Sequence, residues 1–119
     1  MTVHAWTIVK DGQYFLPYWL RHYAAIADRL FVVDDDSHDG TRYLARQHPK
    51  VTLLNHPFTN GMDDQEHADT FNTFTRWLSK DADWVLCPDV DEFLVCDDWP
   101  ALLAKHTALG TIALHTGVA

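Results

Sequence analysis

Apolar and polar residues follow two different patterns along the chain. Short apolar runs of strand length are separated by longer segments whose apolar residues recur at helical spacing. The pattern predicts strands over 3–9, 30–33, 51–54 and 84–87, with a last strand over 111–115. It predicts helices from residue 14 onward, over 41–47, over 63–78 and over 99–106. Strand and helix alternate, which is typical of an α/β fold with a mostly parallel sheet and helices on both faces.

Helix ends and helix faces can also be predicted. Pro17 lies in the first turn of its helix, where a missing amide donor costs nothing. The apolar positions that follow fit one face of a helix, and their aromatic stripe is expected to pack in the core: Phe15, Leu16, Trp19, Leu20, Tyr23, Ile26 and Ala27. Ser37 or, preferably, Asp39 is expected to cap the next helix.

Acidic residues follow two of the predicted strands at the point where each strand ends. Asp34 and Asp35 follow the second strand, and Asp89, Asp91 and Glu92 follow the fourth. In open α/β sheets, ligands lie beyond the carboxyl ends of the strands. Carboxylates there can accept from a base N–H or from a ribose hydroxyl, or bind Mg²⁺ together with substrate phosphates. We therefore expect these two acidic segments to face a common crevice.

A D-x-D triplet alone is weak evidence, because the chain contains 15 Asp and chance alone gives roughly two such triplets. Asp81 and Asp83 precede the fourth strand and are expected in a solvated turn. Asp89 and Asp91 follow it, between apolar residues, and a plain polar turn remains the alternative for them.

Composition narrows the classes of partner. The chain of 119 residues is 47% hydrophobic and 13% aromatic, as expected for one small folded domain. Its formal net charge of −8 disfavours nucleic acid and anionic membranes as partners. A phosphate-bearing ligand would then need a cation to neutralise the acids.

Neither the cysteines nor the histidines show a metal-binding or redox spacing. Cys87 and Cys96 are expected as free thiols in a reducing compartment. There is no apolar run of roughly 18 residues and no signal-peptide layout at the N-terminus. We therefore expect no membrane span and a cytoplasmic location.

Two acidic segments and the opening part of the chain together resemble a known family. Residues 32–41, V-V-D-D-D-S-H-D-G-T, resemble the V-V-D-D-x-S-x-D-G-T signature of family 2 glycosyltransferases. Residues 84–94, W-V-L-C-P-D-V-D-E-F-L, resemble the W-V-L-x-x-D-x-D-E-F-L motif of a subgroup of that family. Residues 8–11 and 16–21 look like that subgroup's V-K-N-E and L-x-E-W-L segments. The resemblance covers about residues 3–95, and three ordered motifs are more specific than one.

The resemblance implies a GT-A fold, a nucleotide-diphosphate-sugar donor, Mn²⁺ or Mg²⁺, and transfer of the sugar to an acceptor hydroxyl. It implies that Lys10, Asp34, Asp35 and Asp89 bind the donor, and that Asp89 and Asp91 bind the metal. It identifies no catalytic base and no acceptor. Because the sequence stops soon after the D-x-D motif, we expect residues 1–119 to form a single domain, incomplete relative to a full enzyme: the donor-binding half of a longer enzyme, or a shortened relative.

Other readings of the same residues stay open. The main alternative is a non-catalytic module that binds a nucleotide sugar and metal or acts as a scaffold. A minor alternative is a haloacid-dehalogenase-like phosphatase, with Asp89 as nucleophile and Asp91 as acid/base. A receiver-like domain fits the order of the elements less well. A truncated sheet could also pair with a second chain through an exposed edge.

Overall fold

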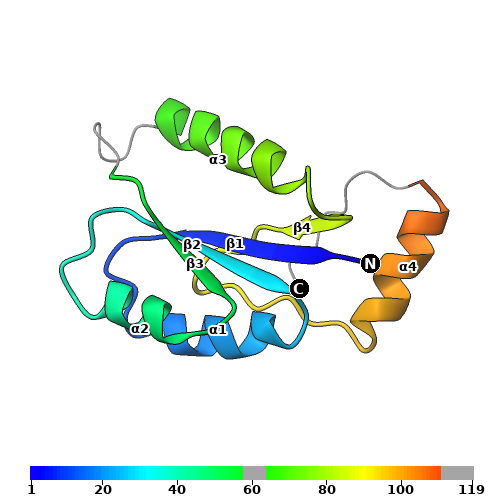
Figure 1. Ribbon diagram of the computed structural model, residues 1–119, viewed down its shortest axis with the longest axis horizontal. Helices are drawn as coiled ribbons and strands as arrows, with labels where there is room; N and C mark the ends of the chain where they lie inside the picture. The colour runs from blue at the N-terminus through cyan, green and yellow to red at the C-terminus, as the bar shows by residue number, and fades with distance from the viewer. Residues whose placement is uncertain (58–63, 111–119) are drawn as a thin grey trace.

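The computed structural model describes residues 1–57 and 64–110, which form an α/β domain (Figure 1). Its strands are β1 (Val3–Val9), β2 (Arg29–Asp34), β3 (Val51–Asn55) and β4 (Trp84–Leu86). Its helices are α1 (Leu16–Ala24), α2 (Thr41–Gln47), α3 (Asp64–Leu78) and α4 (Trp99–Ala108).

Within these ranges the strands form one four-stranded parallel sheet in the order β3-β2-β1-β4. Val9 at the end of β1 pairs with Asp34 at the end of β2, and Ala5 pairs with Leu86 in β4. The chain therefore adds β2 and β3 on one side of β1 and returns to add β4 on the other. In the part of the sheet that is described, β3 and β4 are the edges, and association of two chains through such an edge stays a prediction.

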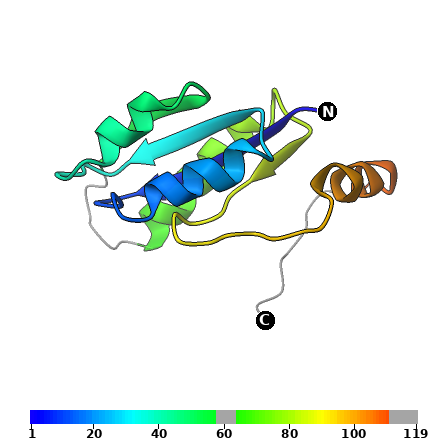
Figure 2. The ribbon, with the colours of Figure 1, turned by 90° about the horizontal axis from the view of Figure 1, so that it is seen from below.

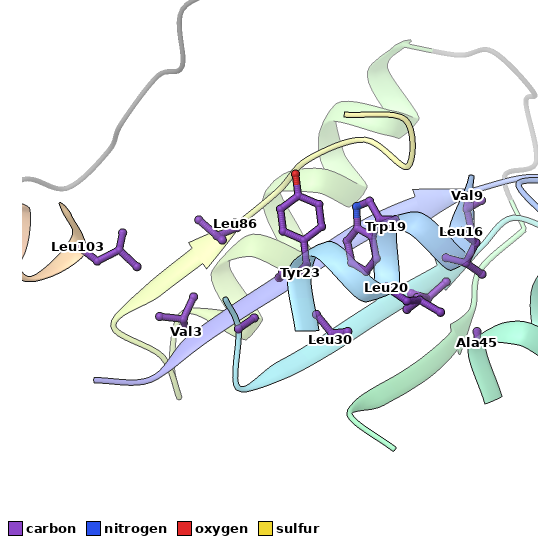
Figure 3. Close-up of a cluster of buried hydrophobic side chains, with 13 residues drawn as sticks. Val3, Val9, Leu16, Trp19, Leu20, Tyr23, Leu30, Ala45, Leu86 and Leu103 are labelled. Carbon is purple, nitrogen blue, oxygen red and sulfur yellow. The ribbon is translucent and has the colours of Figure 1, made fainter. Parts of the chain in front are cut away.

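Helices cover both faces of the sheet, as predicted. Figures 1 and 2 show α1 and α2 on one face and α3 on the other. Because side chains alternate along a strand, β1 contributes to both layers. One layer joins β1 and β2 to α1 (Figure 3), and its buried residues include Val3, Ala5, Val9, Leu16, Trp19, Leu20, Tyr23, Leu30 and Val32. The smaller layer lies under α3 and contains Trp6, Phe31, Val33 and Leu78.

The predicted elements agree closely with the structure. The strand over 3–9 and the helix over 41–47 have the predicted bounds. Trp19 and Tyr23 are buried, which confirms their core role, whereas Phe15 is 40% exposed. Ile26 and Ala27 come after the end of α1. The start of the predicted helix at residue 63 and the predicted strand over 111–115 lie outside the described residues.

The expected cap of α2 is wrong by one residue. The cap position is Gly40, which has no side chain to accept a hydrogen bond. Asp39 nevertheless satisfies the first amide of the helix, because its carboxylate accepts from the Thr41 N–H at 2.9 Å.

Asp83 precedes β4, so it lies at the opposite end of the sheet from Asp89 and Asp91, which follow that strand. Its side chain is exposed and accepts from the Thr2 N–H at 2.7 Å. In the described part of the chain, no helix combines the length and the apolar character needed to span a membrane.

Candidate functional site

A cavity lies where the order of the strands reverses. Since β2 and β4 flank β1 on opposite sides, the carboxyl ends of β1 and β4 form a topological switch point, the usual ligand crevice of an open α/β sheet. The cavity has a volume of about 400 Å³, within the usual range for small-molecule sites. Its lining comes from β1, from α3 and from the residues after β4: Trp6, Thr7, Ile8, Ala68, Phe71, Cys87, Pro88 and Asp89.

Two aromatic rings, Trp6 and Phe71, form part of the wall of this cavity. The Trp6 indole N–H donates to the Cys87 sulfur at 3.0 Å, and the Trp6 and Phe71 ring centroids are 5.3 Å apart. Burial raises the pKa of the Cys87 thiol, although hydrogen bonds to Thr75 and Trp6 oppose it. A thiol that stays neutral is a poor nucleophile. Cys87 is therefore a packing residue in the wall of the cavity, and we do not assign it a nucleophilic role.

An acidic turn forms the polar rim. The Glu92 N–H donates to the Asp89 carbonyl at 2.9 Å, and the Asp89 N–H donates to Glu92 Oε1 at 2.8 Å. Burial raises the pKa of the Asp89 carboxyl, and the negative charges of Glu92 and Asp91 raise it further. All three acids are exposed. The turn therefore concentrates negative charge that a bound cation would relieve.

Helix α1 fixes the segment that follows this turn. The Tyr23 hydroxyl donates to the Glu92 carbonyl at 2.8 Å and accepts from the Leu94 N–H at 2.9 Å. The His22 Nε2–H donates to the Leu94 carbonyl at 2.7 Å. Figure 2 shows the chain after β4 passing beside α1. Sequence reasoning assigned Tyr23 to the core but missed its hydroxyl, whose partners lie 69 and 71 residues further along the chain.

Asp34 is placed differently from the acidic turn. Its side chain is fully buried, in alternation with Leu30 and Val32 toward the layer of α1 and α2. Its Oδ2 accepts from Arg42 Nε at 2.6 Å and from the Ser37 N–H at 3.2 Å. Its Oδ1 has no hydrogen-bond partner within the described ranges. Asp34 is not among the residues that line the cavity beside Asp89.

The Asp34 carboxylate thus orders its own loop. The hydrogen bond and the charge of Asp34 raise the pKa of Arg42, which stays protonated. Arg42 also donates to Asp36 Oδ1 at 3.2 Å. The ion pair joins the end of β2 to α2.

The loop over 34–41 is joined to the loop after β1. Three backbone N–H groups of the loop after β1 donate to side chains of the segment over 34–41. Asp11 N–H donates to Ser37 Oγ, Gly12 N–H to Thr41 Oγ1, and Gln13 N–H to Asp39 Oδ2. Burial raises the pKa of Asp39, but hydrogen bonds from Thr41 and Gln13 outweigh it, so the net pKa is low. The polar residues of the D-S-H-D-G-T segment therefore hold the two loops together through hydrogen bonds.

Lys10 and Asp35 lie at the carboxyl ends of β1 and β2, as expected. Lys10 is exposed directly after β1. Asp35 is half-buried, and its N–H donates to the Val9 carbonyl at 2.8 Å. Of the predicted site residues, the structure brings Asp89 to the cavity and Asp91 to the same turn, and it holds Asp34 apart in the core.

The described residues contain no group of three or more His, Cys, Asp or Glu side chains arranged to hold a metal ion. Asp89 and Asp91 supply two exposed carboxylates on one turn, which is the donor set that Mg²⁺ takes when substrate phosphates complete its shell. The chemistry of these two residues fits that kind of donor set.

In comparisons with known proteins, no protein-family model matches this chain, and no curated protein matches its sequence.

Proposed function

We propose that this chain is the donor-binding part of a GT-A-type glycosyltransferase of family 2. The observation that carries the proposal is the acidic turn of Asp89, Asp91 and Glu92, which lies at the rim of a cavity at the switch point between β1 and β4. The all-parallel sheet and the three ordered motifs support it.

In this proposal the cavity receives the nucleoside of a nucleotide-diphosphate sugar, and the acidic turn receives its diphosphate with Mn²⁺ or Mg²⁺. Asp89 and Asp91 would be the protein ligands of the cation. When bound, the cation would stabilise the charge that develops on the leaving diphosphate. Tyr23 would act as a positioning residue, because it fixes the backbone directly after the turn.

The remaining donor residues take two roles. Lys10 and Asp35, at the ends of β1 and β2, would contact the donor directly. Asp34 would act through Arg42 and Ser37, which its carboxylate holds in place. The acceptor and the catalytic base are not assigned to residues of this chain.

A thermal-stability titration tests the proposal, since a ligand that binds only the folded state raises the melting temperature. We expect UDP or GDP to stabilise the chain in the presence of Mn²⁺, and Asp91→Ala to abolish that effect. Asp81→Ala is the matched control, because Asp81 is an exposed acid of the D-x-D triplet that precedes β4. Asp81→Ala should leave the titration unchanged.

The other outcomes separate the competing functions. Absence of stabilisation by any nucleotide would contradict the proposal and favour a scaffold. Metal-dependent nucleotide binding without turnover of any sugar donor, even when the rest of an enzyme is supplied, would favour a non-catalytic module. Release of phosphate from a simple phosphomonoester would favour a phosphatase.

A further inference from the structure

A second hollow lies beside the amino-terminal end of α1, on the helix layer opposite to α3. We call it the tyrosine groove. It has a volume of about 620 Å³, and its lining includes Tyr14, Tyr18, Arg21, Asp11, Gln13 and Asp39. None of the residues that line the cavity at the switch point lines this groove.

The groove presents aromatic rings to solvent. Tyr14 is 74% exposed and Tyr18 is 51% exposed, and their ring centroids are 6.3 Å apart with the ring planes at 50°. Phe15 packs edge-on against Tyr14 at 5.0 Å. Exposed aromatic residues scattered singly need no explanation, but adjoining rings over a hollow mark a binding surface.

The polar groups around these rings are already fixed. Asp11 Oδ1 accepts from the His38 N–H at 2.7 Å. Gln13 Oε1 accepts from the Gly40 N–H at 2.9 Å, which leaves the Gln13 Nε2 amide without a protein partner in the described residues. Since the loops already hold these side chains, a ligand would order few of them on binding.

The backbone at the groove supports the same interpretation. Asp11 has a φ of 49°, a left-handed conformation that non-glycine residues rarely adopt. Residues held in such conformations cluster at binding sites, where the surrounding structure determines them. Here the Asp11 backbone N–H and carboxylate are both bonded to the loop over 34–41.

The chemistry of the groove fits a saccharide. Tyrosine faces can cover the C–H face of a sugar ring, carboxylates accept from its hydroxyl groups, and an amide and a guanidinium donate to its oxygens. The Arg21 guanidinium already lies over the Tyr18 ring, 5.9 Å from its centroid. The carboxylates of Asp11 and Asp39 would repel a phosphate or another anion.

We propose that the tyrosine groove binds a neutral saccharide, at a site separate from the proposed donor site. The two sites have different lining residues and lie on opposite helix layers of the sheet. The saccharide site therefore does not depend on the nucleotide-sugar proposal.

The test uses the whole chain and two named probes, maltotriose and N,N′,N″-triacetylchitotriose, in saturation-transfer NMR followed by titration calorimetry. We expect millimolar binding of at least one probe, and a loss of affinity of about 5- to 10-fold in Tyr18→Ala, as for the loss of one aromatic contact. Tyr14→Ala should act in the same direction. Tyr43→Ala is the matched control, because Tyr43 is 67% exposed on α2, outside the groove.

The possible results decide the proposal. Binding that falls in Tyr14→Ala and Tyr18→Ala but not in Tyr43→Ala would support it. No binding of either probe, or binding that is unchanged in both groove variants, would overturn it. Circular dichroism of each variant checks the fold, which exposed tyrosines should not affect. Asp91→Ala should bind the probe normally, so failure of the donor proposal would be seen separately.

Discussion

Tyr23→Phe removes one oxygen atom and tests how the acidic turn is anchored. The ring of Tyr23 is fully buried between α1 and the sheet (Figure 3), so the phenylalanine ring should take the same place. The substitution leaves the Glu92 carbonyl and the Leu94 N–H without their partner. Both groups are partly buried, so water replaces the hydroxyl only in part.

The magnitude follows from these two lost hydrogen bonds. Leaving a buried polar group unsatisfied costs about 1–3 kcal/mol, and partial access to water lowers that cost for each group here. We expect the free energy of unfolding to fall by about 2 kcal/mol. For a chain of this size, that corresponds to a melting temperature lower by about 6–12 °C.

The assay is thermal and urea unfolding of Tyr23→Phe beside Tyr43→Phe. The Tyr43 ring is exposed on α2, so removal of its hydroxyl should change the free energy of unfolding by less than about 0.5 kcal/mol. If the two variants lower the melting temperature equally, Tyr23 does not anchor the turn and the reasoning is wrong.

The pH dependence of the free energy of unfolding gives a second measure of the Tyr23 hydroxyl. Burial raises the pKa of Tyr23, the hydrogen bond from Leu94 opposes this, and the charge of Glu92 raises it further. The folded state therefore keeps the phenol proton where the unfolded chain loses it, and wild-type stability should fall as the pH rises above about 10. Tyr23→Phe lacks this loss, so the difference between the two proteins should shrink in that range.

Three further changes test other parts of the account. A Cβ at Gly12 would clash with Val9 Cγ2, so Gly12→Ala should destabilise the protein by about 1–3 kcal/mol in urea unfolding. Combined with Val9→Ala the loss should be less than additive, and strict additivity would contradict the contact. Arg42→Met should lower the melting temperature more than Arg46→Met, an exposed control on the same helix, because Arg42 is the one of these two that pairs with the buried Asp34. Equal effects would contradict this role. Burial and the neighbouring acids raise the pKa of Asp89. As the pH drops, the affinity for Mn²⁺ with nucleotide should therefore begin to fall at a pH above the range in which a carboxyl group ordinarily titrates. Calorimetry from pH 7 to 5 measures this affinity, and a constant affinity would exclude Asp89 as a ligand.

The elements of the fold could be predicted because the strands are short apolar runs and the helices carry apolar residues at helical spacing. β1 is such a run, since it is buried on both faces of the sheet. Because side chains alternate along a strand, Asp34 is in phase with Leu30 and Val32. Its side chain therefore points into the layer of α1 and α2. That signal was present in the sequence, but the acidic segment after β2 was interpreted by its charge instead of its phase.

The cavity and its supports could not be predicted in the same way. The cavity is formed by β1, α3 and the residues after β4, and their approach depends on tertiary packing. The tyrosine groove likewise joins the start of α1 to Asp39 in another loop. Hydrogen bonds across such distances in sequence leave no local pattern that a single chain reveals.

The central claim is that a cation with its nucleotide binds at the carboxyl ends of β1 and β4. Paramagnetic broadening by Mn²⁺ in the presence of UDP, read amide by amide in an NMR spectrum, tests it most directly. The account predicts the strongest broadening at Ile8, Asp89 and Asp91, and weaker broadening at Thr2 and Trp84 at the other end of the sheet. Broadening centred away from the acidic turn, or none at all with any nucleotide diphosphate, would contradict it.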